Sequence, residues 1–231
     1  MQKKNQGQLR LQREGKMAKK DIDQQLKRKG KIEDCFICLP DPEDVYTWYF
    51  IIFGLDYKEF NGGFYMGKIV CPPEYPAKAP KIYMLVDNGR FKTDKNGYAD
   101  GICLSVSHYH PESWNPVWKV NQIVIGLVSF WVTDENTAGA FYKGELPNRD
   151  SYGETESDVR MTYTKNSREI TLKHEKFSIF KDYADAIGIN NISEIDSWKA
   201  HEAKIAEIDE KVAEKKRIDL EKKRLAEEKK K

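Results

Sequence analysis

The sequence has few cysteines and no long hydrophobic run, and both shortages restrict the class of protein. Four cysteines among 231 residues are too few for the disulfide framework of a small secreted domain. The longest apolar run, Ile123–Val132, has ten residues, about half of what a membrane-spanning helix needs. The first thirty residues are too polar for a signal peptide. We therefore expect a soluble chain in a reducing compartment, attached to a membrane only if a further tail follows Lys231.

The cysteines do not form a convincing metal site either. Cys35 and Cys38 have the spacing of metal ligands, but no second pair and no nearby histidine completes a set of four. Two cysteines on a half-buried strand explain the pattern better. We expect no metal and no cofactor.

Charge is abundant but almost balanced, and it is unevenly distributed. Charged residues make up 33% of the chain and the formal net charge is +2, yet residues 1–31 hold eleven Lys/Arg against three acidic residues. A solvated helix face explains most of this basic surface, and docking onto an acidic partner is the alternative. No nucleic-acid partner is expected, because the basic run lacks interleaved aromatic residues.

Strand-forming runs follow this basic segment. Tyr46–Phe53 is aromatic and β-branched on both faces, which predicts a central strand buried on both sides. Gly63–Cys71 and Lys81–Val86 are further predicted strands, and Cys35–Cys38 is a candidate short edge strand. The short connections predict an antiparallel meander.

Helices are expected before and after these strands. Residues 9–29 favour a helix, and so do residues 158–173 and 175–184. Local propensity alone predicts a strand for Ile123–Val132, whereas Asn121 as a candidate helix N-cap argues for a helix. The fold class is therefore α+β, with a four-stranded antiparallel meander flanked by an N-terminal helix and C-terminal helices.

A long charged helix is predicted to end the chain, after a capping box that begins at Ser193. Trp198, Ile205 and Val212 recur every seven residues, but position 219 is aspartate. Two heptads fall short of a coiled coil, so a solvated single helix is favoured. We divide the chain into a disordered tail (1–8), a folded domain (9–185) and a charged helical extension (186–231).

Cys103 is the candidate nucleophile. It lies in Gly101-Ile102-Cys103-Leu104-Ser105, a thiol between short apolar residues in a glycine-containing loop. A buried structural cysteine is the alternative.

Several short motifs precede and follow this cysteine along the chain. They are Gly62-Gly63-Phe64-Tyr65, Tyr75-Pro76, Pro80, Asn88-Gly89-Arg90-Phe91-Lys92, Ile102-Cys103-Leu104-Ser105 and His110-Pro111-Glu112-Ser113-Trp114-Asn115-Pro116-Val117-Trp118. Between residues 9 and 183 this order resembles the catalytic core of ubiquitin-conjugating enzymes. The Asn-Gly-Arg-Phe and His-Pro-x-x-Trp-Asn-Pro segments look most like the tail-anchored branch that serves degradation at the endoplasmic reticulum.

The resemblance implies a function and a set of partners. Cys103 would take the C-terminal carbonyl of ubiquitin from an activating enzyme as a thioester. With a RING-type ubiquitin ligase it would pass ubiquitin to lysines of protein substrates. The branch also implies Ser or Thr as acceptors, and a cytoplasmic location at the cytosolic face of the endoplasmic reticulum.

Asn88 aligns with an asparagine whose side-chain amide stabilises the oxyanion in this family. Loss of such a donor typically costs about 10²–10³ in rate. An asparagine chosen for the Asn-Gly turn is the compatible alternative.

Three departures from the family pattern concern this region. Val86 and Asp87 replace the residues that usually precede the asparagine. Cys103 follows Asn88 by fifteen positions, about five more than in the branch, which we expect to displace Asn88 from the thioester. Ala79 occupies a position that is usually proline, which predicts that the turn lacks a cis peptide bond.

Two histidines close to Cys103 are candidate acids or bases. His110 is our choice for this role and His108 is the other candidate. Packing within the loop is the alternative for either ring. Asp134 and Glu135 lie where the family often orients the incoming lysine, but the alignment is loose there.

A ligase is expected to dock on Ala77 and on Pro116, Val117 and Trp118, beside the first helix. The basic face of that helix would also meet the activating enzyme, so the two contacts would exclude each other. Ala77 replaces a usually large apolar contact, which predicts a weakened ligase affinity.

Two other functions remain open from the sequence. One is a catalytically weak or inactive variant of the same fold that binds ubiquitin or a ligase. The other is a structural role through self-association of the C-terminal helix.

Overall fold

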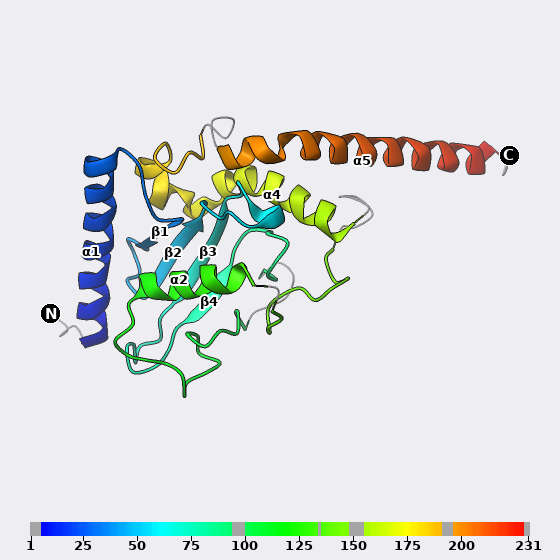
Figure 1. The fold of residues 1–231 in the computed structure, drawn as a ribbon. Helices are drawn as coiled ribbons and strands as arrows, with labels where there is room; N and C mark the ends of the chain where they lie inside the picture. The colour runs from blue at the N-terminus through cyan, green and yellow to red at the C-terminus, as the bar shows by residue number, and fades with distance from the viewer. Residues whose placement is uncertain (1–5, 94–99, 134, 148–154, 191–195, 229–231) are drawn as a thin grey trace.

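The computed structural model describes residues 6–93, 100–133, 135–147, 155–190 and 196–228, and Figure 1 shows the arrangement of its elements. In chain order these are α1 (Gln6–Lys29), β1 (Phe36–Pro40), β2 (Thr47–Ile52), η1 (Lys58–Phe60), β3 (Tyr65–Val70), β4 (Lys81–Met84), α2 (Val120–Trp131), α4 (Glu156–Lys173), η3 (Glu175–Tyr183) and α5 (Asp196–Glu228).

The four strands form one antiparallel sheet in sequence order, which confirms the predicted meander. Phe50 of β2 lies opposite Cys38 of β1 on one side and Gly67 of β3 on the other. An added Cβ at Gly67 would lie 2.2 Å from the Phe50 ring. Glycine at this position therefore makes room for the aromatic side chain on the neighbouring strand.

The sheet is covered on both faces, which explains why β2 is apolar throughout. Trp48, Phe50 and Ile52 enter a core shared with α2. Their neighbours Tyr49 and Ile51 enter a second core shared with η3 and the turn after it. Successive side chains of a strand point to opposite faces, so a strand between two cores needs apolar residues at every position.

Helix α2 crosses one face of the sheet (Figure 1). Its buried residues follow the helical repeat of three and four positions: Val120, Ile123, Val124, Leu127 and Trp131. This confirms the helix over the strand that local propensity favours. The N-cap residue is Lys119 rather than the predicted Asn121, because the backbone of Lys119 is still extended and its N–H donates to the Gln122 side chain.

The ends of the folded domain differ from the predicted boundaries. Helix α1 begins at Gln6, so residues 6–8 are helical rather than a disordered tail. Residues Glu175–Tyr183 form a 3₁₀ helix, not an α-helix. Ile187 and Ile189, beyond the predicted end at 185, are buried in the second core. The capping box at Ser193 lies outside the described residues.

Helix α5 is anchored to the domain by its first part and extends away from it further on (Figure 1). Ile205 and Ile208 are buried against Met161 of α4. Lys165 of α4 also forms an ion pair with Asp209. Part of the apolar repeat, which we predicted to lie on a solvated helix, therefore packs against α4 of the same chain. None of the described helices combines the length and the hydropathy needed to cross a membrane.

Replacing Ile208 with aspartate is expected to detach α5 from α4, because the new carboxylate would be buried without a partner. Hydrogen exchange of the α5 amides near residue 208 should accelerate by about tenfold or more, while β2 stays protected. Leu220→Asp is the matched control, since Leu220 is 71% exposed. Equal exchange in both variants would contradict the anchoring role of Ile208.

Candidate active site

The loop that carries Cys103 is fixed against strand β4. Gly101 has a φ of +85°, and an added Cβ would lie 2.8 Å from the Ile82 carbonyl oxygen. The next residue, Ile102, donates its N–H to that same oxygen at 2.8 Å. Ile102 and Leu104 are buried, whereas Cys103 between them is only half-buried. The loop therefore presents the Cys103 thiol at the surface of the domain.

Residues 137–141, which we call the bridging segment, hold this loop from the other side. The Cys103 N–H donates to the Ala138 carbonyl oxygen at 2.9 Å. The Thr137 hydroxyl donates to the Cys103 carbonyl oxygen at 2.5 Å. Lys92 donates its N–H to the Gly139 carbonyl oxygen at 2.7 Å. The bridging segment thus ties the cysteine loop to the segment that follows Asn88, a role that we did not predict from its small residues.

His110 is the histidine that contacts the candidate nucleophile. Its Nε2 lies 3.2 Å from the Cys103 Sγ, and its Nδ1 lies 2.9 Å from the Glu112 Oε1. The ring is therefore placed between a thiol and a carboxylate. Glu112 lies in the motif that runs from His110 to Trp118, but we did not predict a role for it. Its spacing of two residues from His110 was the available signal.

His108 occupies a different environment. Its ring packs against Tyr109 with centroids 4.3 Å apart. It also lines a cavity of about 450 Å³ together with Ala77 and Trp114. Burial lowers the pKa of His108, and the nearby Lys81 lowers it further. These contacts agree with packing of His108 within the loop.

The other three cysteines are poorer nucleophiles than a surface thiol. Burial raises the pKa of Cys35, Cys38 and Cys71. The thiolate is the reactive form of cysteine, so a raised pKa reduces the reactive fraction at neutral pH. Cys35 and Cys38 are free thiols, and no metal-ligand cluster of three His, Cys, Asp or Glu occurs among the described residues.

Asn88 is fully buried in its own turn. Its Nδ2 donates to the carbonyl oxygens of Val86 at 2.9 Å and Phe91 at 3.1 Å. Its Oδ1 accepts from the N–H groups of Arg90 at 2.9 Å and Phe91 at 2.7 Å. Both amide hydrogens are thus engaged within the turn, which favours the turn-forming role. The oxyanion role stays a prediction, and it requires the turn to release one donor.

Of the two acidic residues predicted near the acceptor, only Glu135 belongs to the part of the chain that the structure describes. Asp134 lies outside the described residues. The Glu135 side chain is exposed, and its carbonyl oxygen accepts a hydrogen bond from Arg90 at 2.5 Å. The contacts to the backbone of Cys103 come instead from Thr137 and Ala138 of the bridging segment.

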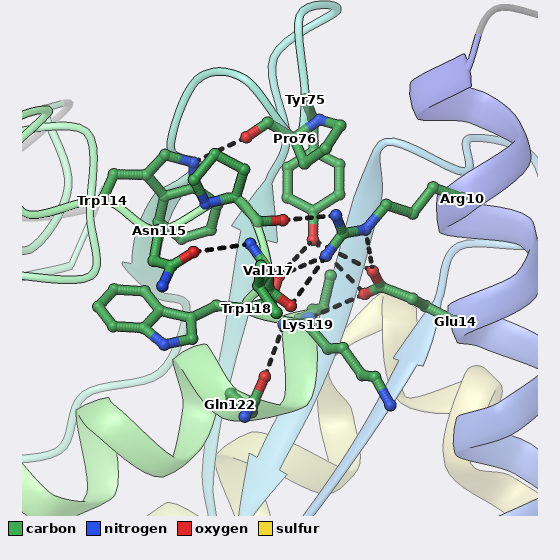
Figure 2. A network of polar contacts seen from close by, with 12 residues as sticks. Arg10, Glu14, Tyr75, Pro76, Trp114, Asn115, Val117, Trp118, Lys119 and Gln122 are labelled. Atoms are coloured by element: carbon green, nitrogen blue, oxygen red, sulfur yellow. Dashed lines mark hydrogen bonds and ion pairs between the residues drawn. The ribbon is translucent and has the colours of Figure 1, made fainter.

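The residues predicted to dock a ligase lie in two loops. We call Ala77, Pro116 and Val117 the docking surface, whereas the fourth predicted residue, Trp118, is half-buried. All three are exposed, and Val117 is 75% exposed. Arg10 of α1 donates to the carbonyl oxygens of Pro116 at 2.5 Å, Val117 at 3.2 Å and Trp118 at 2.8 Å (Figure 2). One guanidinium therefore fixes three successive residues of this loop.

Glu14 connects the same loop to the start of α2 (Figure 2). Its carboxylate accepts from the Arg10 Nε at 2.7 Å and from the Val120 N–H at 2.9 Å. The Trp114 indole N–H donates to the Pro76 carbonyl oxygen at 2.8 Å, which joins the two halves of the docking surface. Buried charge is stabilised when it is paired and hydrogen-bonded, so this network gives the loop a defined shape.

The sequence profile of ubiquitin-conjugating enzymes matches residues 10–169. The chain belongs to the ubiquitin-conjugating enzyme family. This confirms the resemblance and the fold that were expected from the motifs.

Several curated ubiquitin-conjugating enzymes are similar to the chain. Probable ubiquitin-conjugating enzyme E2 33 of Arabidopsis thaliana is 35% identical over 158 residues, which cover 68% of this chain and 58% of that protein. Ubiquitin-conjugating enzyme E2 34 of the same plant is 47% identical over 104 residues, which cover 45% and 42%. Human ubiquitin-conjugating enzyme E2 J2 is 37% identical over 115 residues, which cover 49% and 42%. The chain spans about half the length of these relatives.

A solved structure supports the fold. A protein described as a ubiquitin-conjugating enzyme from Plasmodium yoelii superposes with a TM-score of 0.50 at 18% identity, and the match covers 72% of this chain and 97% of that one. At this identity the likeness concerns the fold alone.

One prediction that we based on a departure from the family pattern is wrong. The Tyr75–Pro76 peptide bond is cis, although we predicted that the turn lacks a cis bond. The proline of this bond is Pro76, which the chain retains. The substitution that prompted the prediction is Ala79, three residues further on.

Proposed function

We propose that this protein carries ubiquitin as a thioester on Cys103 and transfers it to protein substrates. The observation that carries the proposal is the half-exposed Cys103 thiol, whose Sγ lies 3.2 Å from the His110 Nε2. Membership of the ubiquitin-conjugating enzyme family supports the same chemistry.

The loading step needs a deprotonated thiol. The imidazole of His110 is placed to accept the Cys103 proton, since nucleophile and base are within hydrogen-bond reach. The thiolate then attacks the carbonyl carbon of the thioester on the activating enzyme. A new C–S bond forms on Cys103, and the thiolate of the activating enzyme leaves.

We assign the two protein partners to two different surfaces. The basic face of α1 is the proposed contact for the activating enzyme, and the docking surface is the proposed contact for a RING-type ligase. The proposed acceptors are lysine and also Ser or Thr of protein substrates. Similarity to the J2, 33 and 34 proteins agrees with the branch that works at the cytosolic face of the endoplasmic reticulum.

A loading reaction tests the proposal. The protein is mixed with activating enzyme, ATP and ubiquitin, and the products are compared on reducing and non-reducing gels. An adduct that disappears with thiol is expected. Absence of an adduct, with folded protein and an active control enzyme, would contradict the proposal.

A ubiquitin- or ligase-binding variant with weak catalysis is the second candidate function. The specific observation in its favour is the commitment of both Asn88 amide hydrogens to the turn. This function predicts measurable binding of ubiquitin or a ligase together with no adduct in the loading reaction.

Replacing Val117 with aspartate is expected to weaken the response to a ligase. Val117 is 75% exposed, and a carboxylate there would have to be desolvated in an apolar interface. Removal of one important interface contact costs about 1–2 kcal/mol, which is about tenfold in affinity. The measurement is the ratio of thioester discharge with and without a RING ligase. An unchanged ratio would contradict docking at this loop, and Val132→Asp, directly after the end of α2, is the control at an exposed apolar residue.

A further inference from the structure

Three side chains of one short loop lie in a row. His110 stands between Cys103 and Glu112, with contacts of 3.2 Å to the thiol and 2.9 Å to the carboxylate. The carboxylate is 68% exposed and the ring is 42% exposed. An incoming acceptor can therefore reach the exposed edge of the ring beside the sulfur.

Ser107 folds the loop so that His110 returns to Cys103. It is fully buried, and its hydroxyl donates to the Leu104 carbonyl oxygen at 2.8 Å and accepts from the Leu104 N–H at 3.0 Å. The His110 N–H donates to the Ser107 carbonyl oxygen at 3.2 Å. The position of the ring is thus set by the backbone of the loop, and its rotation is set by Glu112.

We propose that Glu112 is a positioning residue that holds His110 as the general base for the acceptor during ubiquitin transfer. A carboxylate at Nδ1 accepts a hydrogen bond from the N–H of that nitrogen, which leaves the lone pair of Nε2 directed at the Cys103 sulfur. Orientation of a catalytic imidazole by a third group is a recurring arrangement in nucleophilic catalysis. This inference rests on the proposed function, because it concerns the second half of the same reaction.

The transfer step moves one proton through His110. The acceptor O–H or N–H gives its proton to the His110 Nε2 as its oxygen or nitrogen attacks the thioester carbonyl. The new C–O or C–N bond forms, and the C–S bond to Cys103 breaks. The departing thiolate then takes the proton from the imidazolium. Glu112 remains ionised throughout and stabilises the imidazolium while it exists.

Among the described residues, the base that contacts the Cys103 sulfur is His110, together with Glu112 behind it. On the opposite side, the bridging segment contributes the Thr137 hydroxyl and the Ala138 carbonyl oxygen. Thr137 already donates to the Cys103 backbone. The carboxylate that is connected to the sulfur through a chain of contacts is that of Glu112.

The test is single-turnover discharge of the full chain after loading with ubiquitin. The activating enzyme is stopped, and α-N-acetylserine, α-N-acetyl-lysine or hydroxylamine is added as the acceptor. All three lose a proton during transfer, but hydroxylamine is nucleophilic enough to attack thioesters without help from a base. Four proteins are compared with the unmodified chain: Glu112→Gln, Glu112→Asp, His110→Gln and the double variant E112Q/H110Q. Glu175→Gln removes the same charge at an exposed site on η3 and serves as the control.

The expected result has three parts. Glu112→Gln slows transfer to the serine and lysine acceptors by about tenfold, and His110→Gln slows it by about 10²-fold. Glu112→Asp restores most of the rate, since it keeps the carboxylate. The double variant is no slower than His110→Gln, because Glu112 acts through His110.

Three results would overturn the inference. They are equal slowing with hydroxylamine, additive losses in the double variant, or a Glu112→Gln rate equal to that of the control. A failure of the unmodified chain to load ubiquitin is a different outcome, and it would reject the proposed function itself.

Discussion

Replacing Asn88 with alanine is expected to lower the free energy of unfolding by about 2–4 kcal/mol. The variant removes both donors and the acceptor that hold the turn, so the buried polar groups of Val86, Arg90 and Phe91 lose their partners. Each buried group left unsatisfied costs about 1–3 kcal/mol, and the losses are only partly additive. Chemical denaturation with an unchanged m-value measures the effect.

The matched control for this prediction is Asn115→Ala. Asn115 is exposed, and its Oδ1 accepts a hydrogen bond from the Val117 N–H at 3.0 Å. Its loss should cost about 1 kcal/mol or less. If Asn88→Ala is as stable as the control but discharges ubiquitin 10²–10³-fold more slowly, the typical cost of one oxyanion donor, the oxyanion role would be supported and the purely turn-forming role contradicted.

Replacing Cys103 with alanine is expected to abolish the ubiquitin adduct, and Cys103→Ser is expected to trap it. An alkoxide leaves far less readily than a thiolate, so the serine ester should persist in the presence of thiol. The loss is expected to be complete because burial raises the pKa of the other three cysteines. Non-reducing gels of the loading reaction measure both variants, and Cys35→Ala is the control at a half-buried thiol.

The sheet could be predicted from the sequence because its signals are local. Residues 46–53 are apolar on both faces, and the structure shows that β2 lies between two cores. Helix α2 was different, since five of the ten residues from Ile123 to Val132 are Ile or Val. Asn121 as a candidate N-cap and the family resemblance favoured a helix there. Tertiary packing on the sheet outweighs the strand propensity of such residues.

The site could be predicted only in part. Cys103 and His110 were named from their motif, but residue types alone offered no physical reason to prefer His110 to His108. The backbone turn at Ser107 brings the His110 ring back to Cys103. Residue types alone do not show in which direction such a turn leads the chain. Thr137 lies 34 residues from Cys103 along the chain, so no local pattern indicated their contact.

The central claim is that Cys103, among four cysteines, carries ubiquitin. Peptide mapping of the loaded protein by mass spectrometry under non-reducing, mildly acidic conditions tests it most directly. The account predicts that the carboxyl end of ubiquitin is found on the peptide that contains Cys103. A ubiquitin thioester on Cys35, Cys38 or Cys71, or a thiol-sensitive adduct that persists in Cys103→Ala, would contradict it.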